Sequence, residues 1–163
     1  MPHTTSRAGP TTVIGFIHRD PAKMPDFVLV FTSAGRLSLT HQHMLTVNGT
    51  LKQASLLEAG DVLETADGRK ATVASTETYV GRGAYHIFVD TPTYYAHNNG
   101  VGSSPAEAFE VSNLMLWEDW GLDKFQWLYD RAVACYAKGN PFNWGHEIWE
   151  NKGTRAKEEA FKC

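Results

Sequence analysis

Short apolar runs separated by turn residues fill the first hundred positions of the chain. Each run is only a few residues long, which is typical of a strand rather than a helix. Asn-Gly at 48–49 and 99–100 and Asp-Gly at 67–68 are dipeptides that favour tight turns between strands. Many short strands with frequent turns predict a compact all-β domain. The expected strands lie near residues 13–17, 27–31, 37–39, 44–47, 61–64, 71–75, 85–89 and 93–96.

The pattern changes at Ser104. This serine, followed by Pro105 and by Glu107 three residues on, has the order of an N-cap, a first helical position and a capping acid. It predicts a helix that continues to about Trp117. Apolar residues then recur at helical spacing over 125–136, and a glycine and a proline follow that end a second helix.

Two segments are therefore expected: a mainly β core over residues 12–104 and a helical extension over 105–163. The extension holds all five tryptophans of the chain. An amphipathic helical pair would use these rings to pack on the β core. The alternative is an apolar binding surface, which would make the protein a binding module. The tryptophans are Trp117, Trp120, Trp127, Trp144 and Trp149.

Composition excludes several classes of protein. A hydrophobic share of 42% and a charged share of 20% are typical of a globular chain, and the net charge of -3 gives no reason to expect nucleic acid or an anionic membrane as partner. No apolar run reaches the length of about 20 residues that spans a bilayer. Residues 1–12 are polar and do not form a secretory signal. The compartment stays open, with the secretory pathway or the extracellular space compatible with a longer parent protein.

The sharpest candidate for chemistry is Thr40 with His43, directly after an expected strand. A threonine and a histidine three positions apart can face one backbone carbonyl. The histidine would donate a proton to a departing amide nitrogen, and the threonine would hold the peptide in place. The alternative is a strand end with a polar hydroxyl and surface imidazoles. A metal site is a third hypothesis, because His41 and His43 share one face of a strand and His86 or His97 could complete a ligand set.

These residues belong to a longer array that resembles the Hedgehog C-terminal autoprocessing domain, a Hint domain related to inteins. The similarity extends from a strand that ends in a His-Arg-Asp-Pro turn to the closing pair of strands. The positions that carry it are Phe16–Pro21, Phe27–Phe31, Gly35–Leu45, Ala54, Leu57–Leu63, Val73–Ser75, Gly83–Tyr85 and 95–104.

The resemblance implies a Hint-like all-β fold and protein autoprocessing. In that family a cysteine at the start of the domain attacks its own upstream peptide bond, and a second nucleophile captures the thioester: a sterol in Hedgehog proteins, a thiol or hydroxyl in inteins. By resemblance, Thr40 and His43 promote the first acyl shift. His18 stands where Hedgehog proteins carry the aspartate that activates the sterol, so it is the candidate base for the second step. No cofactor is implied, and the partners are the upstream polypeptide and the acyl acceptor.

The sequence also departs from the family. The stretch that carries the nucleophilic cysteine in the family does not precede the strand at Val13, so we expect this chain to be inactive alone. Cys135 lies in an expected helix, where a packing role is favoured over a thiolate, and Cys163 lies in the same tail. His97-Asn98 resembles the pair that closes inteins, but a turn explains it as well. Pro105 stands at the family's final cysteine, which argues against ligation.

Overall fold

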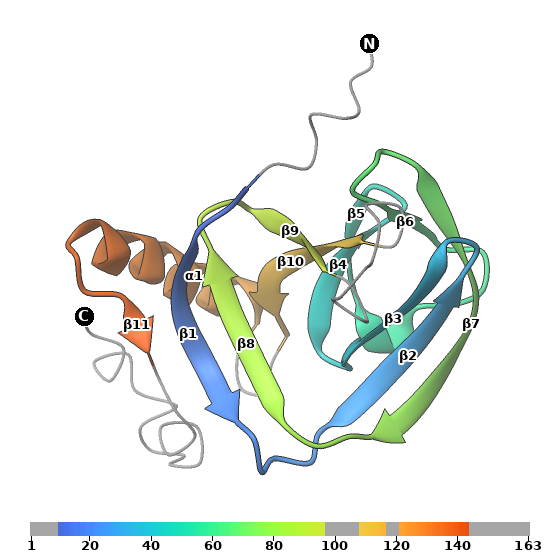
Figure 1. Ribbon diagram of the computed structural model, residues 1–163, viewed down its shortest axis with the longest axis horizontal. Helices are drawn as coiled ribbons and strands as arrows, with labels where there is room; N and C mark the ends of the chain where they lie inside the picture. Colours follow the sequence, from blue (N-terminus) through green and yellow to red (C-terminus); the bar gives the residue numbers. More distant parts are fainter. Residues whose placement is uncertain (1–9, 97–107, 117–120, 144–163) are drawn as a thin grey trace.

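The computed structural model describes residues 10–96, 108–116 and 121–143, with the backbone alone for 17–20 and 142–143. Most of these residues lie in short strands, and one α-helix follows them (Figure 1), which confirms the predicted mainly β fold class with a C-terminal helix. The elements are β1 Val13–Asp20, β2 Asp26–Thr32, β3 Gly35–Thr40, β4 His43–Val47, β5 Thr50–Gln53, the 3₁₀ turn Ala54–Leu56, β6 Val62–Glu64, β7 Lys70–Val80, β8 Ala84–Val89, β9 Thr93–Ala96, β10 Phe109–Met115, α1 Leu122–Ala137 and β11 Phe142–Asn143.

The strands form two sheets that curl around the core. A small sheet has the order β11-β1-β8, and a larger one has the order β3-β2-β7-β6-β4-β10-β9, with β5 paired to β4. The β1–β8 pair and the β2–β7 pair are long, and they meet at one end, where the chain passes from β1 to β2 and from β7 to β8 (Figure 1). There the Gly81 N–H donates to the Pro25 carbonyl and the Gly83 N–H donates to the Lys23 carbonyl. This junction holds the small sheet against the larger one.

The core has two parts. In the larger sheet, alternate residues of β2, of β3 and of the first part of β7 are buried and point inward, as the period of two of a strand requires. The second part lies between the small sheet and α1. The first cluster contains Val28, Val30, Leu37, Leu39, Leu45, Val47, Ala54, Leu57, Leu63, Ala71, Val73, Phe109 and Val111, and the second contains Ile14, Phe88, Met115, Phe125, Leu128, Ala132 and Cys135.

Helix α1 confirms the prediction made from the spacing over 125–136. Its buried residues are Phe125, Leu128, Ala132 and Cys135, which follow one another at three or four positions and form one face. This face packs against β1 and β10 beside the small sheet (Figure 1). Cys135 is buried there and disulfide-bonded, so it holds no free thiolate. The inner face of α1 therefore serves the core. No helix in the described ranges is long and apolar enough to cross a membrane.

The predicted helix over 105–117 is wrong, because residues Phe109–Met115 form strand β10. This strand pairs antiparallel with β9 on one edge and with β4 on the other. Phe109 and Val111 are buried on either side of the half-buried Glu110, an alternation that suits a strand. The capping signal at 104–107 lies outside the described residues. Because β10 fills the gap between β4 and β9, backbone pairing outweighs the local helix signal. The division of the chain near residue 104 stays a prediction.

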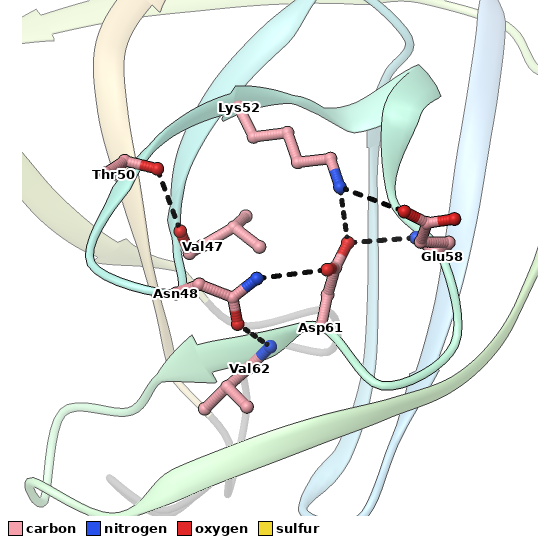
Figure 2. Close-up of polar contacts among 7 residues, drawn as sticks. All are labelled: Val47, Asn48, Thr50, Lys52, Glu58, Asp61 and Val62. Atoms are coloured by element: carbon pink, nitrogen blue, oxygen red, sulfur yellow. Dashed lines mark hydrogen bonds and ion pairs between the residues drawn. The ribbon is translucent and has the colours of Figure 1, made fainter.

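A buried carboxylate ties the β4–β5 hairpin to the loop before β6 (Figure 2). Asp61 is 6% exposed and accepts hydrogen bonds from Lys52 Nζ at 2.8 Å, the Glu58 N–H at 3.0 Å and Asn48 Nδ2 at 3.1 Å. The Asn48 side chain also accepts from the Val62 N–H at 2.9 Å. Burial raises the pKa of the Asp61 carboxyl, but the hydrogen bonds from Lys52, Glu58 and Asn48 and the Lys52 charge together lower it. These bonds hold the β4–β5 hairpin to the start of β6.

Candidate active site

Thr40 and His43 stand on either side of the turn between β3 and β4. Thr40 is the last residue of β3 and half-buried, and His43 is the first residue of β4 and buried. The turn is anchored on both sides, because the His41 carbonyl accepts the Ser55 N–H and the Gln42 carbonyl accepts the Leu116 N–H. The spacing thus places the two residues at one turn. No hydrogen bond joins their side chains in the described part of the chain, and that both face one backbone carbonyl stays a prediction.

The His43 ring is held by a backbone carbonyl. Its Nε2 lies 2.8 Å from the Ser112 carbonyl oxygen of β10, and because a carbonyl only accepts, Nε2 carries the proton. Nδ1 is therefore the basic nitrogen of the neutral ring. Burial lowers the pKa of His43, although the hydrogen bond to Ser112 opposes the shift. A neutral imidazole at neutral pH can accept a proton and then return it, as general base and acid catalysis requires.

A second histidine lies directly on the first. The rings of His43 and His86 are stacked with centroids 5.0 Å apart and planes 16° from parallel. His86 comes from β8, and its Nε2 donates to the Asn113 carbonyl at 2.7 Å. The sequence pointed to His86 only as a third metal ligand. Its period-two position in β8, facing inward with Phe88, was the signal that placed it in the interior. Both residues are buried, with His43 8% and His86 3% exposed.

An irregularity in β10 supplies both carbonyls. Val111 pairs with Leu45 and Met115 with His43, so β10 spans four positions where β4 spans two. Consecutive carbonyls of a regular strand point to opposite edges. The bulge over residues 112–114 instead lets Ser112 and Asn113 each accept from one ring of the pair. The irregular stretch of β10 is what binds the two histidines.

The other sequence candidates take different positions. The backbone of His18 in β1 pairs with His86, so His18 lies in the strand next to the histidine pair. The His41 ring turns elsewhere, with Nδ1 3.2 Å from the Asp26 carbonyl. In the described residues, no group of three or more His, Cys, Asp or Glu side chains gathers in a way that could hold a metal. His97, Asn98 and Cys163 lie outside these residues.

Comparison with known proteins gives the fold. No protein-family model and no curated protein matches the sequence. Among solved structures, the gp41-1 intein is similar at a TM-score of 0.50 with 14% identity over 65% of this chain and 74% of that one. A substituted form of that intein gives a TM-score of 0.50 with 13% identity over 65% and 75%. An intein-like domain from Clostridium thermocellum gives 0.49 with 17% identity over 63% and 70%. The two matches at a TM-score of 0.50 show that the protein has the Hint fold of inteins.

Proposed function

We propose that this protein is an autoprocessing Hint domain of the Hedgehog type, in which His43 moves the proton of an acyl shift at a peptide bond. The observation that carries the proposal is the state of the His43 ring. It is buried, its Nε2–H is fixed on the Ser112 carbonyl, and its pKa is lowered, mainly by burial. A surface imidazole at a strand end would have none of these properties. The Hint fold supports the same conclusion.

In the first step, Nδ1 of His43 accepts the proton of a cysteine thiol. The sulfur then bonds to the carbonyl carbon of the preceding residue. The C–N bond of that peptide breaks, and His43 passes the proton to the departing nitrogen, which becomes the free amine of the cysteine. Thr40, at the other end of the turn, would hold the strained peptide. Because Cys135 is disulfide-bonded, its sulfur does not serve as this thiol.

In the second step, an acceptor with a hydroxyl or thiol bonds to the acyl carbon. The C–S bond breaks, and the acceptor's proton returns to sulfur. His18 is the proposed base, and its support is that its backbone pairs with His86, next to His43. A histidine loses its basicity as the pH falls through its pKa, so transfer by His18 would be sensitive to acid. Sterol and small thiols are the two acceptors to compare.

The test of the first step uses a restored domain. A Gly-Cys-bearing N-terminal segment from a Hint relative, with a reporter protein before it, is joined ahead of Met1 and incubated with dithiothreitol. We expect cleavage at the cysteine, detected by mass spectrometry, while the chain by itself keeps its mass. His43→Ala should lower the rate about 100-fold or more, as loss of a positioned acid-base group does. His41→Ala, in the same turn but bonded to Asp26, is the control and should keep the rate.

Equal rates for His43→Ala and the parent would refute the proposal. The second step is tested in the same restored domain with His18→Ala and His18→Asp. If His18 is the base, His18→Ala lowers acyl transfer without changing thioester formation, and His18→Asp raises transfer to sterol. If neither variant changes the rate of either step, His18 is not part of the site.

A further inference from the structure

The stacked histidines do not follow from the proposed acyl shift, which needs one imidazole. The second ring is held as firmly as the first. His86 lies 5.5 Å from Phe88 in an edge contact and 5.5 Å from Phe125 of α1. The hydrogen bond from Nε2 to the Asn113 carbonyl also holds the His86 ring in its orientation over His43.

That carbonyl is itself immobilised. The Asn113 side chain is buried and accepts the Val89 N–H at 2.9 Å, and it donates to the carbonyls of Thr91 at 2.5 Å and Pro92 at 3.1 Å. Asn113 thereby fastens the β10 bulge to the connection between β8 and β9. The acceptor of His86 and the strand that carries His86 are therefore fixed to each other, and the His86 ring keeps its plane.

We propose that His86 is a positioning residue for His43: its ring face holds the His43 imidazole flat against it, so that Nε2–H stays on the Ser112 carbonyl and Nδ1 stays the basic nitrogen. The importance of His86 for catalysis rests on the proposed function, whereas its effect on the orientation of the His43 ring does not. A 180° turn of the ring about χ2 would put Cε1 in the place of Nε2 at the Ser112 carbonyl and Cδ2 in the place of Nδ1. The stack at 5.0 Å blocks that rotation.

The surroundings of His43 make its protonation a sensitive measure of this contact. His86 is the titratable group that faces it from β8, and the Ser112 carbonyl faces it from β10. In the described part of the chain, no carboxylate or cationic side chain forms an ion pair or hydrogen bond with His43. Burial alone therefore lowers its pKa, and removal of the covering ring would admit water and raise the pKa toward its usual value.

Two substitutions separate the ring face from the hydrogen bond. His86→Gln keeps an N–H donor for Asn113 but has no ring to stack, and His86→Phe keeps a ring face but has no donor. The chain as it stands is labelled with ¹⁵N, and the imidazole nitrogens of His43 are followed from pH 4 to 8 by NMR. We expect the parent and His86→Phe to show the Nε2–H form with a lowered pKa. His86→Gln should show a mixture of tautomers and a higher pKa.

Val30→Ala controls for lost stability, because Val30 is buried in the other core cluster, and this variant should leave the His43 signals unchanged. Unchanged signals in His86→Gln would overturn the proposal, and so would equal changes in both variants. If His86→Phe does not fold, the result for His86→Gln decides alone.

In the restored domain, His86→Gln should lower the rate of the first step about 10- to 100-fold, which is the order of loss when a catalytic group is misplaced by about 1 Å. The midpoint of its pH–rate profile should rise with the pKa of His43. If the restored domain without any substitution does not cleave at all, the proposed function is refuted, and the NMR result still decides the role of His86.

Discussion

Replacing Asp61 by asparagine should destabilise the protein more than any exposed Asp→Asn change. The carboxylate accepts from three donors, Lys52, Glu58 and Asn48, inside a site that is 6% exposed. An amide has a single accepting oxygen, so at least one donor meets an NH₂ group and Lys52 loses its anionic partner. A neutral hydrogen bond contributes about 1 kcal/mol and one to a charged group about 1.5–3 kcal/mol. The Lys52 side chain is 26% exposed and can regain water, which limits its part of the loss.

We therefore expect Asp61→Asn to lower the free energy of unfolding by about 2–3 kcal/mol, which is about 5–10 °C in Tm for a domain of this size. Urea unfolding followed by tryptophan fluorescence measures the change. Asp130→Asn is the matched control. Asp130 is exposed on α1 and accepts one hydrogen bond, from Gln126 at 2.9 Å, so its loss should stay within about 0.5 kcal/mol. If both variants lose the same small amount, the argument from the three donors is wrong.

The acid dependence of the same variant has a definite sign. Burial raises the pKa of Asp61, but its hydrogen bonds and the Lys52 charge outweigh burial and lower it below the usual value. The unfolded chain, with a carboxyl pKa of about 3.9, then binds the proton more readily than the folded one. The stabilisation by ionised Asp61 is present above that pH and is lost as the pH falls through the folded pKa. The parent and Asp61→Asn should therefore converge in stability at low pH.

Three further results are expected. Because the pKa of His43 is lowered in the folded protein, the unfolded chain binds this proton more readily. The contribution of His43 to the free energy of unfolding is therefore constant above a pH of about 6.5 and falls below it. His43→Gln should remove this pH dependence from urea unfolding measured over the same pH range. Phe125→Ala should cost about 3–5 kcal/mol in calorimetry, because the ring is fully buried, whereas Tyr136→Ala on the exposed face of α1 should not. Asn113→Ala should cost about 2–3 kcal/mol and speed amide exchange at the end of β8, since it leaves buried backbone groups without a partner.

Much of the β core could be predicted from the sequence because local rules and tertiary structure agree there. Asn48 adopts a left-handed φ of 51° and Gly49 one of 83°, as the Asn-Gly dipeptide at that hairpin indicates. The strand at 27–31 and the helix over 125–136 have a single periodicity and a single buried face. The pairing of β1 with β8 is different, because it joins residues far apart in the chain, and no local pattern determines such a partner.

The sequence brings Thr40 and His43 together as candidates because they lie three positions apart at one turn, and their catalytic roles stay predictions. His86 is distant in sequence and meets His43 only through the fold. The conformation of residues 109–115 determines which carbonyls bind the two imidazole rings. As the predicted helix, this segment would have used its carbonyls within its own turns and offered none to an imidazole. As a bulged strand, it turns Ser112 and Asn113 toward the two rings. The helix prediction was wrong and the histidine pair went unrecognised for the same reason. Both depend on the strands that pair with β10, which only the folded chain brings together.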